Sequence, residues 1–123
     1  MKTIKFRHFK LDDRLLCVLD EIGFAECTPV QAECLPLILE GHDVAGQAQT
    51  GTGKTAAFLL STINFLLTKK IDNNRNLRAI IIAPTRELAI QIHKDAEILN
   101  RYCDLKIGLV YGGVDYEKQQ KKI

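Results

Sequence analysis

The chain has 123 residues, of which 46% are hydrophobic and 26% are charged, a balance typical of one globular domain rather than a disordered or low-complexity protein. Its formal net charge of +2 is too small for nucleic-acid binding by overall electrostatics, so any such binding must come from a specific site. No apolar run approaches the roughly 20 residues that span a bilayer, and the first ten residues include charged ones where a signal peptide would be apolar. We therefore expect a cytoplasmic protein with no membrane partner.

Two helices are predicted in the first third of the chain. The first begins at a capping aspartate, Asp12 or Asp13, spans about 13–22 and ends at Gly23, which permits a left-handed C-cap. Its apolar residues share one face: Leu15, Leu16, Leu19 and Ile22.

The second helix starts with a pattern typical of helix N-termini. Thr28 is the expected cap, Pro29 the first helical residue, and Gln31 the third, where its side chain can close a capping box. Pro36 should kink this helix or end it early.

The rest of the chain alternates strands and helices. A short strand at 43–46 is followed by a glycine-rich turn, a helix over about 54–67 and a polar loop at 68–76. The apolar residues of this helix that we expect to point inward are Phe58, Leu59, Ile63 and Leu66.

A second strand and helix follow. Residues 79–83 read AIIIA, a run typical of a strand buried on both faces. They precede a helix over about 86–101 and another buried strand at 107–111. The inward face of that helix is expected to hold Leu88, Ile92, Ala96 and Leu99.

This alternation predicts an α/β fold, with a parallel sheet covered by helices on both faces. Only about three strands are present, and the charged stretch 116–123 has no strand after it. We therefore expect the chain to be part of a larger protein.

The cysteines show neither a C-x-x-C pair nor a histidine at zinc-ligand spacing, so they predict no metal site. Cys17 and Cys34 lie among apolar residues, which favours small buried side chains in a reducing compartment.

Residues 48–55 read AQTGTGKT between a strand and a helix, which is the context of a P-loop. Glycines at 51 and 53 let backbone N–H groups turn toward an anion, and the helix N-terminus adds partial positive charge. Lys54 would reach the β- and γ-phosphates, and Thr55 would place its hydroxyl on Mg²⁺. The predicted phosphate-binding residues are Ala48, Gln49, Thr50, Gly51, Thr52, Gly53, Lys54 and Thr55.

The usual catalytic carboxylate of a P-loop ATPase has no candidate after this loop. The two later apolar strands end in Pro84-Thr85 and in Gly112-Gly113, and neither supplies an aspartate. Asp20-Glu21 resembles such a strand end, but it precedes the P-loop on an amphipathic helix, which favours a solvated helix face.

Four segments together resemble DEAD-box RNA helicases. They are GFAECTPVQ (23–31), AQTGTGKT (48–55), PTRELA (84–89) and GG (112–113), which occur in the order of the Q motif, motif I, motif Ia and the GG motif of that family. Phe6, 17 residues before Gly23, matches an isolated aromatic upstream of the Q motif. The amino-acid sequence around these motifs is most similar to the bacterial RhlB group.

The resemblance implies a truncated RecA-like domain, with 1–123 as the N-terminal portion of the first helicase domain. It implies ATP and Mg²⁺ as cofactors, with Gln31 reading adenine, Phe24 stacking on the base and Phe6 forming an outer wall. From the residues alone, Gln31 could simply close the capping box, and both phenylalanines could be core residues.

The resemblance also implies contacts with the RNA backbone. The residues concerned are Pro84, Thr85, Arg86, Gly112 and Gly113. Without it, Arg86 would be read as a surface charge and the two glycines as a plain turn. A P-loop NTPase unrelated to RNA is disfavoured by PTRELA and Gln31.

The sequence departs from the family in lacking the Asp-Glu-Ala-Asp box, the Ser-Ala-Thr motif and a second RecA-like domain. We therefore expect these 123 residues to bind nucleotide without hydrolysing it, within an RNA helicase of RNA processing or decay and with an RNA-degradation complex among its partners. The alternative is a structural or interaction fragment that binds neither ligand.

Overall fold

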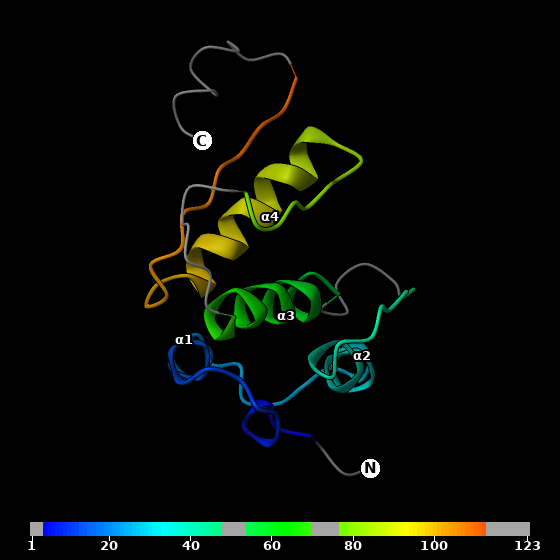
Figure 1. Cartoon of the computed structure of the whole chain (residues 1–123), viewed down its shortest axis with the longest axis vertical. Helices are drawn as coiled ribbons and strands as arrows, with labels where there is room; N and C mark the ends of the chain where they lie inside the picture. Colours follow the sequence, from blue (N-terminus) through cyan, green and yellow to red (C-terminus); the bar gives the residue numbers. More distant parts are fainter. Residues whose placement is uncertain (1–3, 48–53, 70–76, 113–123) are drawn as a thin grey trace.

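The computed structural model describes residues 4–47, 54–69 and 77–112. Helix α3 lies at the centre, with α4 on one side and with α1 and α2 on the other (Figure 1). The elements are a 3-10 turn at Phe6–His8, α1 at Asp13–Glu21, α2 at Pro29–Leu39, α3 at Lys54–Thr68 and α4 at Arg86–Leu99. No helix in the described ranges is long and apolar enough to span a membrane.

The predicted helix starts are confirmed. The Asp12 carboxylate accepts the Arg14 N–H of α1, and the Thr85 hydroxyl accepts the Leu88 N–H of α4. In α2, Thr28 is the cap and Pro29 the first helical residue. Each cap satisfies an N–H group that the helix itself leaves without a partner, which is why short local patterns located these ends.

Two expectations about the helices were wrong. Helix α2 does not end at Pro36 but continues to Leu39, so the early end is wrong, while the alternative of a kink stays a prediction. The missing proline N–H removes only one hydrogen bond, and the neighbouring Leu35 is fully buried. Leu88 was expected to point inward, yet it is 39% exposed in the first turn of α4. Ile22, expected on the apolar face of the first helix, is 37% exposed and caps the C-terminus of α1.

The predicted sheet is absent from the part of the chain that the structure describes. Its one β-bridge is antiparallel and pairs Lys5 with Glu26. The segments expected as strands, at 43–46, 79–83 and 107–111, pair with no other described segment, and Ile82 in the second is 89% exposed rather than buried. A strand is defined by backbone hydrogen bonds to a neighbouring strand, and within the described residues these segments form no such ladder.

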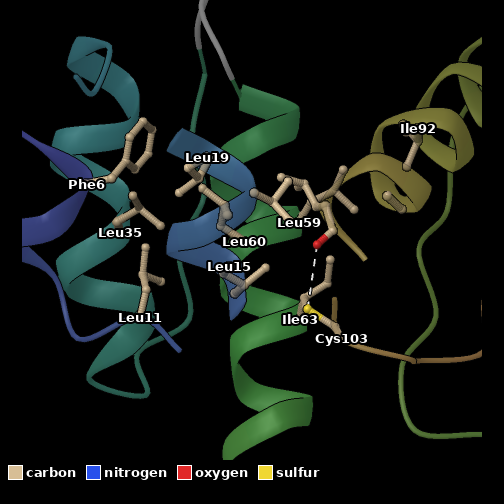
Figure 2. Packing of buried hydrophobic residues seen from close by; sticks show 13 residues of the cluster. Phe6, Leu11, Leu15, Leu19, Leu35, Leu59, Leu60, Ile63, Ile92 and Cys103 are labelled. Atoms are coloured by element: carbon tan, nitrogen blue, oxygen red, sulfur yellow. Dashed lines mark hydrogen bonds between the residues drawn. The ribbon is translucent and has the colours of Figure 1, made fainter. Parts of the chain in front are cut away.

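The core lies where α1, α2 and α3 meet (Figure 2). Its most buried leucines are no more than 1% exposed: Leu15, Leu19, Leu35, Leu59 and Leu60. Ile92, Ala96 and Leu99 extend the core along α4, and the thiol of Cys103 donates a hydrogen bond to the Leu99 carbonyl at 3.6 Å. Cys17 is exposed, so the prediction that it is buried was wrong, and Cys34 is only partly buried. Phe58 and Leu66 of α3 are likewise half-buried, so they meet the expected inward position only in part.

Polar side chains fasten the irregular segments to the helices. The buried Asn64 of α3 accepts the Asp12 N–H at 2.8 Å, which ties the start of α1 to the core. Arg78 donates to the carbonyls of Leu66 and Lys69, at 3.2 and 3.0 Å, and so satisfies acceptors at the C-terminal end of α3. The chain that follows residue 77 therefore begins anchored to α3.

Candidate nucleotide and RNA site

The predicted phosphate site begins at the N-terminus of α3. Residues 48–53 of the P-loop lie outside the described residues, whereas Lys54 and Thr55 open the helix and are half-buried. The first N–H groups of a helix point outward along its axis without helical partners, so this end attracts an anion. An ammonium and a hydroxyl at this position are the side chains that a phosphate and its Mg²⁺ would require.

Gln31 occupies a buried position at the start of α2. Its Oε1 accepts the Thr28 N–H at 2.9 Å, while the Thr28 hydroxyl accepts the Gln31 N–H at 3.4 Å, so the capping box is formed. Only 3% of the residue is exposed, which encloses the amide. The cap uses one of the two lone pairs of the amide oxygen.

The two phenylalanines predicted near the base lie in different environments. Phe24 is 45% exposed and follows Gly23, whose φ of +80° ends α1 in the left-handed conformation that glycine adopts without strain. Phe6 is 2% exposed and belongs to the core, and its N–H donates to the Ala25 carbonyl at 3.2 Å. Phe24 is thus accessible to solvent, whereas Phe6 is part of the core.

The predicted RNA residues gather at the N-terminus of α4. Thr85 caps the helix, Arg86 is its first residue, and both are exposed, as is Pro84. The Arg86 guanidinium lies over the ring of Tyr111, 5.8 Å from its centroid, and Gly112 follows directly. The two predicted RNA segments are therefore neighbours in space, although Gly113 lies outside the described residues.

The segment after α4 returns along the helix to make this meeting (Figure 1). Asn100, which ends α4, clamps Leu105: its Nδ2 donates to the Leu105 carbonyl at 2.6 Å and its Oδ1 accepts the Leu105 N–H at 2.9 Å. Seven extended residues cover about 23 Å, which matches the roughly 21 Å of a 14-residue helix. Residues 105–111 thus run from one end of α4 to the other.

The sequence motifs did not indicate Tyr111 as a site residue. Its position immediately before Gly112 was the available signal, but nothing local indicates that its ring meets Arg86, which is 25 residues earlier. The contact depends on the path of the returning segment, and this path follows from tertiary structure.

Asp20 and Glu21 form a solvated helix face, as expected. Asp20 pairs with Arg7, and Glu21 accepts hydrogen bonds from the Tyr102 hydroxyl and from Arg101, the latter at 2.8 Å. These two donors, the tyrosine first, lower the pKa of Glu21 below its ordinary value. Glu21 links α1 to the residues just after α4, and Asp20 links α1 to Arg7.

Two of the four thiols, Cys27 and Cys103, are in environments that disfavour the thiolate. Burial raises the pKa of Cys27 to about 11 and also raises the pKa of Cys103, which keeps both protonated at neutral pH. In ranges 4–47, 54–69 and 77–112, no group of histidine, cysteine and carboxylate side chains is arranged to hold a metal ion.

Curated relatives of this chain include bacterial proteins named ATP-dependent RNA helicase. The chain is 57% identical over 120 residues to the ATP-dependent RNA helicase RhlB of Shewanella sediminis, covering 95% of this chain and 28% of that protein. It is 54% identical over 122 residues to the protein of the same name from Aeromonas salmonicida, covering 97% of this chain and 28% of that protein. The chain therefore spans little more than a quarter of the length of these relatives.

Solved structures show the same likeness in three dimensions. A DEAD box protein from Methanococcus jannaschii matches with a TM-score of 0.85 and 36% identity, over 98% of this chain and 32% of that one. Prp28 from Chaetomium thermophilum, an RNA helicase bound to ADP, matches with a TM-score of 0.81 and 34% identity. This match covers 94% of this chain and 29% of the Prp28 chain. These neighbours identify the fold as part of a RecA-like domain, so the predicted fold class is confirmed although the described residues form no sheet.

A family model gives the same result from sequence. The model described as DEAD/DEAH box helicase matches residues 28–123, which include the capping box of α2, the P-loop sequence and the segments around Arg86 and Gly112. The chain belongs to the DEAD/DEAH box helicase family.

Proposed function

We propose that this chain is the ATP-binding portion of an ATP-dependent RNA helicase. The observation that carries the proposal is the position of Lys54 and Thr55, which open α3 directly after the P-loop sequence. A lysine, a hydroxyl and a helix N-terminus at one point favour a nucleotide polyphosphate with Mg²⁺, and Thr55 would be the metal ligand. Bound Mg²⁺ would supply charge neutralisation between the β- and γ-phosphates.

The base would lie toward the start of α2. We propose that Gln31 reads adenine through both amide atoms, that Phe24 stacks on the ring through its exposed face, and that Phe6 forms the outer wall of this site through the packing it supports. Because the Gln31 amide is enclosed, this role requires that the neighbouring side chains part when nucleotide binds. The capping box would then hold the amide in one orientation.

The RNA would contact the N-terminus of α4. We propose that Pro84, Thr85, Arg86, Gly112 and Gly113 engage its sugar-phosphate backbone. Support comes from the exposed guanidinium, the helix N-terminus beside it and the proximity of Tyr111-Gly112. Contacts of this kind are independent of base sequence, which suits a protein that remodels many RNAs.

Hydrolysis would need groups that these 123 residues do not supply, namely an aspartate on the Mg²⁺ shell, a carboxylate for water and an arginine from a second domain. We therefore propose nucleotide binding without turnover for the chain as given. For the protein that carries the full set of motifs, we propose RNA-stimulated ATP hydrolysis in the cytoplasm, in RNA processing or decay and within an RNA-degradation complex.

The test compares the chain with Lys54→Ala. Mg-ATP should raise the thermal unfolding midpoint of the parent chain by mass action and leave the variant unchanged. Steady-state phosphate release with saturating single-stranded RNA should be negligible in both. Multiple turnovers that disappear in the variant would refute binding without hydrolysis, and an unchanged midpoint in the parent would favour a structural or interaction role.

A further inference from the structure

The contact between Arg86 and Tyr111 joins the two segments that we place at the RNA. Arg86 begins α4, and Tyr111 ends the segment that returns along it. The guanidinium lies 5.8 Å from the ring centroid, so the end of this segment contacts the start of the helix. Tyr111 is partly buried and Arg86 is exposed. The ring is thus the fixed partner, and the guanidinium is the one that solvent and ligand can reach.

A guanidinium held over a ring keeps its N–H groups available. The ring attracts the flat face of the cation, whereas the N–H donors lie in the guanidinium plane and point outward along its edges. Two of these donors can meet two oxygens of one phosphate. An aromatic partner therefore restricts the arginine without consuming the hydrogen bonds that a phosphate requires.

The charge of Arg86 also has no acidic partner among the described residues. Among residues 4–47, 54–69 and 77–112, no carboxylate forms an ion pair with it, whereas Arg7, Arg14 and Arg101 each pair with an acidic side chain. A carboxylate partner would compete with phosphate for the same donors, but an aromatic ring does not.

We propose that Tyr111 is a positioning residue for RNA binding, whose ring holds the Arg86 guanidinium ready for a backbone phosphate. The proposal rests on the proposed function of Arg86. The aromatic face is the required feature, so phenylalanine should replace tyrosine at this position and leucine should not.

The first experiment measures the affinity of the protein for a labelled oligouridylate and a labelled oligoadenylate at fixed low salt. Tyr111→Leu should weaken the affinity for both oligonucleotides by about two- to fivefold, the range expected for an exposed cation–π contact. The affinities of Tyr111→Phe should stay close to those of the parent. Tyr102→Leu is the matched control, because this tyrosine contacts Glu21 and lies beyond the far end of α4. Its affinity for both oligonucleotides should equal that of the parent.

A double-mutant cycle separates positioning from direct contact. If the ring acts through Arg86, Tyr111→Leu should have no further effect in an Arg86→Ala background. If the loss persists there, Tyr111 contacts the RNA itself and the positioning role is overturned. Equal affinity of the parent and Tyr111→Leu would overturn it as well.

Nuclear magnetic resonance of the arginine side chains tests the contact without RNA. The Arg86 Nε proton, assigned by its loss in Arg86→Lys, should be shifted by the ring, and the shift should vanish in Tyr111→Leu and persist in Tyr111→Phe. A shift combined with unchanged RNA affinity in Arg86→Ala would refute the RNA role of Arg86, and the positioning role with it. If Arg86→Ala weakens RNA binding but the parent shows no ring shift, only the role of Tyr111 would be refuted.

Discussion

Replacing Gln31 should separate two roles that one side chain holds. Its Oε1 accepts the Thr28 N–H at 2.9 Å, and the residue is 3% exposed. Gln31→Ala removes this bond and leaves the Thr28 N–H without its side-chain acceptor, so the free energy of unfolding should fall by about 1–3 kcal/mol. It should also erase a preference for ATP over GTP, which the same range of energies places at about 5- to 150-fold.

Thr28→Ala is the matched control because it breaks the other half of the same capping box. The Thr28 hydroxyl accepts the Gln31 N–H at 3.4 Å, a long bond, so the loss should lie in the lower part of the range of about 0.5–2 kcal/mol for N-caps. The Thr28→Ala variant should keep the preference for ATP over GTP, since the Gln31 amide is intact.

Urea unfolding gives the stabilities of the two variants, and competition between ATP and GTP for a fluorescent adenine nucleotide gives the base preference. An ATP preference that survives Gln31→Ala would refute adenine reading. If Thr28→Ala also abolished the preference, the effect would follow the integrity of the helix start rather than the amide.

Other parts of the structure give further expectations. Leu60→Ala in the core should cost about 2–5 kcal/mol in urea unfolding, whereas Phe65→Ala, at a 54% exposed position of the same helix, should cost far less. The lowered pKa of Glu21 in the folded state means that its contribution to stability is present above the ordinary value of 4.5 and is lost as pH falls through the folded value. Glu21→Gln should therefore be less stable than the parent near neutral pH, with a gap that closes on acidification in pH-dependent thermal melts. Arg86→Ala should weaken binding to unrelated RNA sequences alike and reduce the dependence of affinity on salt, and a strong sequence preference in the parent would contradict this.

Features of the fold that depend on a few consecutive residues could be predicted from sequence. The starts of α1, α2 and α4 follow from Asp12, Thr28 and Thr85, because a cap acts on N–H groups two or three residues away. The Lys54-Thr55 start of α3 follows equally from the P-loop pattern. These are interactions that a local reading can identify.

Features that depend on distant partners could not. The apolar character of 79–83 is that of a buried strand, yet Ile80 and Ile82 are 70% and 89% exposed, since burial depends on which elements cover them. The enclosure of Gln31 and the meeting of Arg86 with Tyr111 likewise depend on packing between separate segments. Sequence patterns specify what a residue can do, but the neighbours supplied by the fold decide whether it does so.

The Asn100 clamp has a consequence at the opposite end of α4. Its amide offers Leu105 the donor and acceptor that a backbone peptide would offer, and so it sets the register of the returning segment. From Leu105 onward, half-buried and exposed residues alternate up to Tyr111, which falls on the half-buried side, and Gly112, which is exposed. A slip of one residue would turn Tyr111 outward and bring Val110, which has no aromatic ring, to face Arg86. The side chain that fixes which residue meets the guanidinium thus lies about 20 Å away, at the other end of the helix.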